Sequence, residues 1–159
     1  MQSSAIFSNC GRYRYRLNRR WADGGECVFV GLNPSTADRA KNDATVIRCI
    51  QFARAWGFGG LTLVNLYARR CRYPQALGTS DDPVGPDNDL WLQSVIGDAP
   101  LAIAMWGNHG ARAYGQGTRR DILVMKSRDE WHCFGQTKLK APKHPLYLPK
   151  ETSLQTFSL

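Results

Sequence analysis

The stretch VFVGLNPSTAD, residues 28–38, sets the organisation of the chain. Its apolar start has the continuous hydrophobic character that is typical of a strand buried on both faces. The run then breaks into GLNPS, whose glycine, asparagine, proline and serine favour a turn. Ligands of open parallel sheets bind beyond the carboxyl ends of the strands. This turn is therefore either a ligand-binding segment or only the end of a strand.

Further apolar runs alternate with segments of helical periodicity. The expected strands are LTLVNL (residues 61–66), LAIAMW (101–106) and WHCFGQT (131–137), and the expected helices lie within residues 42–60, around 89–96 and within 118–128. Strands that alternate with helices indicate a parallel sheet with right-handed crossovers. We therefore expect an α/β three-layer sandwich around a central, mostly parallel four-stranded sheet.

The N-terminal segment RYRYRL, residues 12–17, alternates strictly and predicts a half-exposed antiparallel edge strand added to this sheet. The alternation places Arg12, Arg14 and Arg16 on one face and Tyr13, Tyr15 and Leu17 on the other. Residues 69–86 are rich in Arg, Pro, Gly and Asp and predict a long surface loop. We expect one domain over residues 1–159, with a core at 26–149 and a polar, loosely attached tail at 150–159.

The charge balance points to an anionic partner. The chain has 21 Lys and Arg against 13 Asp and Glu, a formal net charge of +8. Such an excess favours nucleic acid or a nucleotide as partner, because basic side chains release counterions condensed on polyanions. The alternative is a generic basic surface without such a partner.

Other classes of protein find little support in the composition. No apolar stretch is long enough to span a bilayer and no signal-peptide pattern opens the chain, so we expect no membrane association and a cytoplasmic location. The five cysteines are scattered without a C-x-x-C motif, which indicates reduced thiols and neither a metal site nor another cofactor.

Polar residues leave the expected strands at one edge of the sheet. Amides, imidazoles and arginines gathered there would suit a polar or anionic ligand. Each also has a structural alternative: an amide can brace a turn or cap a helix, and a lone histidine is often structural. The residues concerned are Asn33, Ser35, Asn65, Arg69, Arg70, Asn108, His109 and His144.

Four motifs in their order resemble the α/β-fold uracil-DNA glycosylase superfamily. GLNPS (31–35) resembles the first motif of its mismatch-specific branch, and HPLYL (144–148) resembles the second motif. LTLVNLYARRCRYP (61–74) is similar to the strand-Asn segment of the iron–sulfur members, and LAIAMWGNHGARA (101–113) is similar to their third strand. More narrowly, GLNPSTAD with a terminal HPLYLP resembles a bacterial and phage family that carries both motifs.

The resemblance implies a uracil-DNA glycosylase-like fold and a role for several residues. Asn33 would position the hydrolytic water, Asn65 would read the edge of a pyrimidine, and His144 would donate a hydrogen bond to the departing base. Neighbouring residues would line the base or ligand site. These are Gly31, Leu32, Pro34, Ser35, Tyr67, Asn108 and His109.

The sequence also departs from the superfamily pattern. Ser35 replaces a glycine, and Leu146 replaces the serine that contacts DNA phosphate, although Leu146 or Leu148 could serve as an apolar wedge. Cys71 matches one cysteine of the iron–sulfur members, but the paired N-terminal cysteines are absent, so no cluster is expected.

A second group of residues would suit phosphate. Asn42 and Arg48, with Asp43 and Thr45, stand at an expected helix start, and Lys138 precedes His144. The alternative is helix capping for the first set and a solvated lysine for the second. Together with Arg69, Arg70 and Leu146, Asn42, Arg48 and Lys138 form the predicted contacts to phosphate or nucleic acid.

Three functions remain open from the sequence. The first is a hydrolase of the DNA glycosylase type, which cleaves the N-glycosidic bond of a damaged or modified base in DNA repair or nucleotide modification. The second is an enzyme with the same fold that acts on a free nucleoside, a nucleotide or an RNA base. The third is a nucleic-acid or nucleotide-binding module without catalysis.

Overall fold

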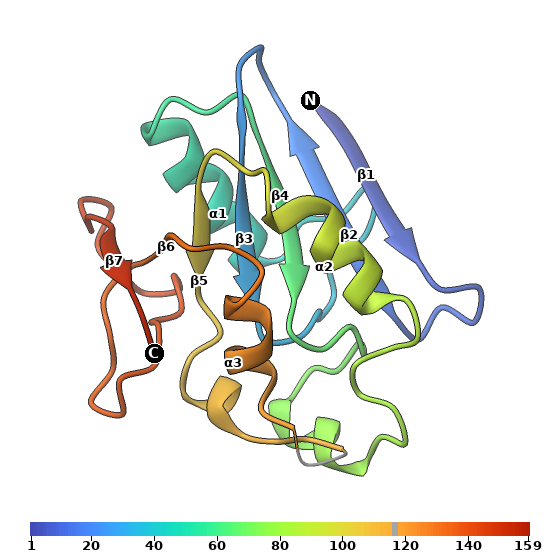
Figure 1. The fold of residues 1–159 in the computed structure, drawn as a ribbon. Helices are drawn as coiled ribbons and strands as arrows, with labels where there is room; N and C mark the ends of the chain where they lie inside the picture. Colours follow the sequence, from blue (N-terminus) through green and yellow to red (C-terminus); the bar gives the residue numbers. More distant parts are fainter. Residues whose placement is uncertain (116–117) are drawn as a thin grey trace.

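The chain folds as an α/β protein around one mixed, seven-stranded sheet. A computed structural model describes residues 1–115 and 118–159. The strand order is β1-β2-β4-β3-β5-β6-β7 (Figure 1). The strands are β1 (Gln2–Phe7), β2 (Arg14–Arg20), β3 (Glu26–Gly31), β4 (Gly60–Asn65), β5 (Ala102–Ala104), β6 (Trp131–Cys133) and β7 (Gln155–Phe157).

The centre of the sheet is parallel and its margins are antiparallel. Strands β4, β3, β5 and β6 run in the same direction, whereas β1 and β2 on one side and β7 on the other run against their neighbours. The described part of the chain has three α-helices, α1 (Ala44–Ala55), α2 (Asn88–Ile96) and α3 (Arg120–Met125). Two 3₁₀ segments precede α2 and α3, respectively: η1 (Pro74–Thr79) and η2 (Asn108–Ala111). Helix α1 covers one face of the sheet, and α2 and α3 cover the other.

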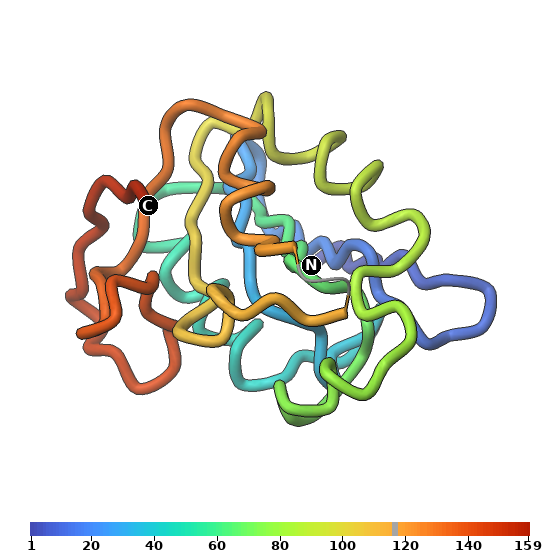
Figure 2. Tube along the Cα trace, turned by 60° about the horizontal axis from the view of Figure 1, so that its bottom comes forward, coloured from blue at the N-terminus to red at the C-terminus, as the bar shows by residue number. Residues whose placement is uncertain are grey.

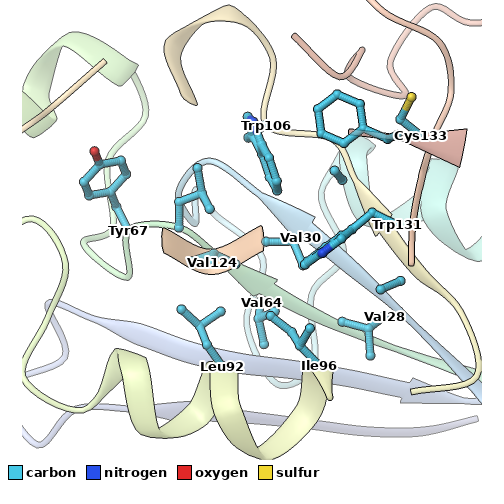
Figure 3. Close-up of a cluster of buried hydrophobic side chains, with 14 of the residues drawn as sticks. Val28, Val30, Val64, Tyr67, Leu92, Ile96, Trp106, Val124, Trp131 and Cys133 are labelled. Atoms are coloured by element: carbon cyan, nitrogen blue, oxygen red, sulfur yellow. The ribbon is translucent and has the colours of Figure 1, made fainter. Parts of the chain in front are cut away.

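Alternation along the central strands divides the core into two clusters. On β3, Val30 faces α2 and α3, whereas Phe29 faces α1. Figure 3 shows the first cluster, in which Leu92 and Ile96 of α2 pack beneath the sheet valines. Each large apolar side chain buried in this way contributes about 1.5–3 kcal/mol. The two clusters therefore fix which face of the sheet every residue of the site will occupy.

Helix α1 follows the expected pattern closely. Asp43, at the expected helix start, is the N-cap and accepts a hydrogen bond from the Val46 N–H at 2.9 Å. Gly57 lies just past the helix with φ of +86° and donates its N–H to Arg54, while Phe58 donates to Ala53. This is the Schellman arrangement that favours glycine at the end of a helix.

Two predictions about the margins of the sheet are wrong. The strand within residues 12–17 is not an edge strand, because β1 pairs outside β2. The segment 150–159 is not loosely attached, because β7 pairs with β6 and buries Phe157. The sequence gives little indication of either strand, because three of the six residues of β1 are polar and β7 has only three residues.

A one-residue irregularity in β2 changes the face to which its first residue points. Ile6 and Phe7 are consecutive in β1, yet they pair with Arg16 and Arg14, so Tyr15 is the extra residue. A bulge of this kind shifts the side-chain alternation by one position. Arg14 is consequently buried on the α1 face and donates to the Ala37 carbonyl at 2.9 Å, contrary to the predicted exposed arginine stripe.

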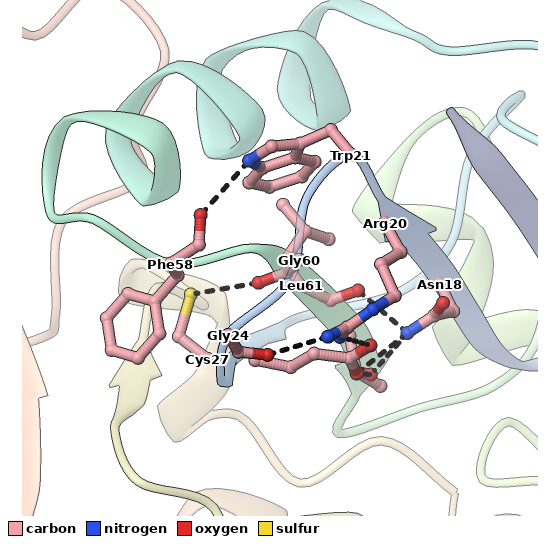
Figure 4. A network of polar contacts seen from close by, with 10 residues as sticks. Asn18, Arg20, Trp21, Gly24, Cys27, Phe58, Gly60 and Leu61 are labelled. Atoms are coloured by element: carbon pink, nitrogen blue, oxygen red, sulfur yellow. Dashed lines mark hydrogen bonds and ion pairs between the residues drawn. The ribbon is translucent and has the colours of Figure 1, made fainter.

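The loop between β3 and α1 is held by a second buried arginine of β2. Arg19 donates to the Asn42 side chain at 2.8 Å and to the Asp38 carbonyl at 2.5 Å. A different network lies at the start of β3 (Figure 4): Arg20 donates to Glu26 and to the Gly24 carbonyl. The side chains of Arg14 and Arg19 therefore hold the loop between β3 and α1, and the side chain of Arg20 holds the start of β3.

Replacing Arg19 with Met is expected to lower the free energy of unfolding by about 2–3 kcal/mol, because buried acceptors lose charged donors. Arg20→Met is the control, since its partly exposed ion pair contributes at most about 1 kcal/mol. Urea denaturation followed by circular dichroism measures both. Equal losses in the two variants would contradict the role of Arg19 as a loop anchor.

Candidate ligand-binding site

The loops that leave the parallel strands gather at one edge of the sheet (Figure 2). A pocket of about 290 Å³ opens there on the α1 face. Its buried floor comes from strand ends, and its more exposed rim comes from the loops after β3, β5 and β6. The pocket therefore stands where open parallel sheets place their ligands.

The floor is built by the same alternation that forms the α1-facing core. Leu63 and Asn65 of β4, Gly31 of β3 and Met105 after β5 all line it. Gly31 pairs in register with Asn65, and a Cβ atom on Gly31 would lie only 2.8 Å from the Asn65 Oδ1. The glycine of the GLNPS motif is thus needed because the Asn65 amide occupies the space above it.

Asn65 is an unsatisfied buried amide. Asn65 is 3% exposed, and its Nδ2 makes no hydrogen bond within the described residues. Buried polar groups nearly always have a partner, so an orphaned one needs an explanation such as a missing ligand or water. Of the two expectations for Asn65, ligand contact and structural bracing, this geometry favours ligand contact.

Asn33 braces a turn and still lines the pocket. Its Nδ2 donates to the Cys71 carbonyl at 2.9 Å and to the Pro34 carbonyl at 3.1 Å. These two bonds fix the orientation of the amide, because only the nitrogen can donate. The bracing alternative is therefore correct for the nitrogen, and the oxygen is not used in either of these two bonds.

Two histidines reach the rim. The Leu146 N–H donates to His144 Nδ1 at 3.3 Å, so a neutral His144 ring carries its proton on Nε2. Desolvation by the surrounding protein lowers the pKa of His144, and the carboxylate of Asp43 opposes that shift. His109 shares a hydrogen bond of 2.9 Å with the Tyr114 hydroxyl, and burial also lowers its pKa.

Two charged pocket residues were not predicted to line the base site. Asp43, which the sequence placed with Thr45 at a helix start that would suit phosphate or provide a cap, lines the pocket wall together with Thr45. Arg14, predicted on an exposed edge strand, lies in the floor. The position of Asp43 could have been inferred, since a helix start after a parallel strand lies at the ligand edge. The position of Arg14 depends on the bulge, which has no sequence signal.

The remaining predicted base-site residues divide between the rim and the interior. Leu32, Ser35 and Asn108 line the pocket, although Asn108 does not cap η2 and instead accepts from the Thr137 hydroxyl at 2.6 Å. Pro34 is buried behind the rim. Tyr67 lies in the other core cluster, where its hydroxyl donates to the Arg112 carbonyl.

The predicted phosphate group is not assembled at the pocket. Asn42 is engaged by Arg19, and Arg48 donates to Gln51 and to the Leu148 carbonyl while its guanidinium lies 4.7 Å from the Phe52 ring centre. Lys138 and Leu146 do not line the pocket either. The capping alternative is therefore correct for Asp43 alone, and Asn42 and Arg48 make structural contacts that the sequence did not predict.

Arginines gather instead in a shallow groove next to the pocket. Arg12, Arg69, Arg70 and Arg72 line it, and Ser35 lines both the groove and the pocket. The backbone creates this cluster: Arg14 N–H donates to Ala68 and Arg70 N–H donates to Arg12, so the chain before β2 runs beside residues 68–70. The predicted Arg69 and Arg70 thus lie together at a basic surface that continues from the pocket mouth.

The predicted apolar wedge is replaced by an exposed tyrosine. Leu146 is half-buried and Leu148 packs against the α1-facing core. Between them, Tyr147 is 98% exposed and has a φ of +66°, a backbone conformation that is rare for residues other than glycine. An aromatic ring held out in this way is available for stacking.

A larger cavity, of about 440 Å³, lies among residues 81–85, the first turn of α2 and helix α3, and it differs in chemistry. Its arginine, Arg120, donates to Asp89 at 2.5 Å and to the Leu66 carbonyl, so its charge is already paired. Because this cavity offers no buried polar group without a partner among the described residues that line it, we assign the ligand site to the smaller pocket.

The part of the chain that the structure describes contains no cluster of three or more metal-binding side chains. All five cysteines belong to that part and are free thiols. Among the same residues, no helix has the length and apolarity needed to cross a membrane.

The fold and the site define an α/β protein with a largely apolar pocket at the carboxyl ends of the parallel strands, into which a buried arginine, amides and histidines are set. Residues 14–146 match the family described as protein of unknown function (DUF1643), and the chain belongs to that family. The matched range begins at Arg14 and ends just past His144, so it includes every pocket residue. No match was found among curated proteins or solved structures.

The pKa of His144 is expected to fall further in Asp43→Asn, because the carboxylate that favours the imidazolium is removed while Asn still caps α1. The pKa of His109 should stay unchanged, since it is set by burial and by Arg112. NMR titration of the imidazole resonances measures both. An unchanged or raised pKa of His144 would contradict this placement of Asp43.

Proposed function

We propose that the protein is a base-recognising hydrolase that cleaves the N-glycosidic bond of a damaged or modified base in nucleic acid. The observation that carries the proposal is the convergence of Asn33, Asn65 and His144 from three separate segments on one pocket. The sequence resemblance to the uracil-DNA glycosylase superfamily assigns these same three residues to water, base edge and departing base. A uracil-DNA glycosylase-like version of the α/β fold is part of the proposal.

Recognition of the base would depend on Asn65. An amide offers a donor and an acceptor side by side, which matches the edge of a pyrimidine. The unpartnered Nδ2 at the pocket floor supports this role, because a bound base would supply the missing acceptor. A pocket of about 290 Å³ has the scale of a single flipped base with its sugar at the mouth.

The chemistry divides among three side chains. The Asn33 oxygen accepts a hydrogen bond from a water molecule, whose oxygen attacks the sugar carbon C1′ as the bond to the base nitrogen breaks. The electron pair of that bond leaves with the base, and the His144 Nε2–H stabilises the developing negative charge. The proton of the attacking water passes to Asp43.

Asp43 is a better proton acceptor than Asn33, the residue that the sequence resemblance assigned to the attacking water. An amide such as Asn33 orients water but accepts a proton poorly, whereas a carboxylate can act as general base. Asp43 lies in the same pocket wall and acts electrostatically on His144. Asn33 is then a positioning group for water, and Asp43 is the proton acceptor.

The basic groove supports nucleic acid as the carrier of the base. Four arginines stand directly beside the pocket mouth, where the backbone flanking a flipped base would pass. Tyr147 projects fully into solvent two positions after Pro145 in the HPLYL motif and would stack on a base or fill the vacated space. The protein would thus hold phosphate at the groove and the base in the pocket.

An enzyme acting on a free nucleoside or nucleotide is the second candidate. The absence of the motif-two serine, which is replaced by Leu146, favours it. The two candidates share the pocket chemistry and differ only in whether the basic groove is occupied.

Base release from oligonucleotides and from the matching free nucleosides, measured by mass spectrometry, tests the proposal. His144→Ala should lower the rate by about 10²–10³-fold. Asp43→Asn should lower it by about 10²–10⁴-fold, and Asn33→Ala by about 10²-fold. His132→Ala is the control, because His132 pairs with Glu130 outside the pocket.

Substrates should include uracil, G·T and G·U mismatches, hypoxanthine and alkylated bases. Release from oligonucleotides that the pocket variants abolish supports the first candidate, and turnover of nucleosides alone supports the second. Absence of any product from folded wild-type protein would contradict hydrolysis of these bases and leave the binding-module hypothesis.

Removal of groove arginines should weaken binding of single-stranded DNA. In the double variant Arg12→Gln, Arg72→Gln, the slope of log affinity against log salt should fall by about 1 to 1.5, since about 0.7 is lost per phosphate contact on a single strand. Fluorescence anisotropy at several salt concentrations measures the slope. Lys126→Gln, Lys150→Gln is the charge-matched control, and an equal change there would argue against a localised groove.

A further inference from the structure

A buried guanidinium lies in the pocket floor without a full set of partners. Arg14 is 2% exposed, and its Nη1 donates to the Ala37 carbonyl. Its Nε makes no hydrogen bond within the described residues, and Arg14 forms no ion pair with any described carboxylate. A buried charged group with an unsatisfied donor lowers the free energy of unfolding, so stability alone does not explain an arginine at this position.

The surroundings of Arg14 are cationic. Burial lowers the pKa of Arg14 to about 10, the carboxylate of Asp43 opposes this, and Arg70 and Arg19 add to it. The side chain is therefore still charged at neutral pH. Asp43 is the one acidic group that acts on it, and that carboxylate already accepts the Val46 N–H at the start of α1.

A second unpartnered donor lies in the same floor. The Asn65 Nδ2 and the Arg14 Nε are both buried and both lack an acceptor, and their two residues line the same pocket, whereas Arg16, whose Nε also lacks an acceptor, does not line it. The Arg120 guanidinium of the other cavity provides the contrast, because Asp89 and the Leu66 carbonyl satisfy it. Two orphaned donors, one of them charged, define an acceptor site for an anionic group.

We infer that Arg14 and Asn65 form an oxyanion subsite in the pocket floor, which takes a ligand carrying a negatively charged oxygen group. The inference deepens the proposed function and rests on it for the nucleobase part of the ligand. The charged oxygens can belong to a nucleotide phosphate or to an acidic substituent on the base itself. In either case, the bulge at Tyr15 places the Arg14 side chain on the face of the sheet that carries the pocket.

Isothermal titration calorimetry with four probes tests the subsite: uridine, uridine 5′-monophosphate, orotate and inorganic phosphate. A charged hydrogen bond at the floor should make at least one anionic pyrimidine bind about 10- to 100-fold more tightly than uridine. Tighter binding of the monophosphate identifies a phosphate subsite, and tighter binding of orotate identifies an acidic base.

Arg14→Met should reduce this preference to within about twofold, and Arg14→Lys should retain part of it, because a lysine keeps the charge without the guanidinium geometry. Arg16→Met is the matched control, since Arg16 belongs to the same strand but does not line the pocket. Thermal melting checks that each variant is folded. If Arg14→Met does not fold, the wild-type comparison of uridine with the anionic probes decides alone.

The two proposals fail in different ways. Equal affinity for uridine and both anionic pyrimidines, or a preference that persists in Arg14→Met, overturns the oxyanion subsite and leaves the hydrolase proposal standing. Phosphate binding that depends on Arg14, without nucleoside competition and without base release, supports the subsite and overturns the proposed hydrolase.

Discussion

The parallel pairing of β3 with β4 is the constraint on which the site depends. Its register sets Gly31 beside Asn65, and the missing side chain of the glycine is what lets the amide lie across the floor. The pairing continues beyond both strands, where Leu66 and Tyr67 donate to the carbonyls of Gly31 and Leu32. Backbone hydrogen bonds therefore continue from the sheet into the GLNPS turn, and they fix the position of the Asn33 backbone.

Strand β2 provides two arginines that hold the loop carrying the pocket wall. It lies antiparallel to β4, and its buried arginines act on the loop that carries the pocket wall. Arg19 serves this loop through the Asp38 carbonyl, and its donors are largely consumed. Arg14 also holds the loop, through Ala37, but it keeps an unused donor at the pocket. The difference between these two arginines separates a structural guanidinium from one that is available to a ligand.

The sequence predicted the parallel centre of the sheet, helix α1, and the meeting of Asn33, Asn65 and His144, because continuous apolar runs and periodic helices carry strong local signals. It did not predict β1 or β7, whose short polar strands depend on partners distant in the chain. The exposed face predicted for Arg14 was wrong because strict alternation cannot reveal a bulge. Arg48 was placed near phosphate by its helix position, but its side chain turns to Leu148 and Phe52.

A crystal structure of the protein with a bound pyrimidine nucleotide tests the central claim most directly. The account predicts the base in the pocket at the carboxyl edge, with an acceptor within hydrogen-bonding distance of the Asn65 Nδ2 and an anionic oxygen near the Arg14 guanidinium. It also predicts that Gly31 lies beneath the Asn65 amide as it does in the free protein. A nucleotide bound in the cavity beside Arg120, with only water on Asn65 and Arg14, would contradict it.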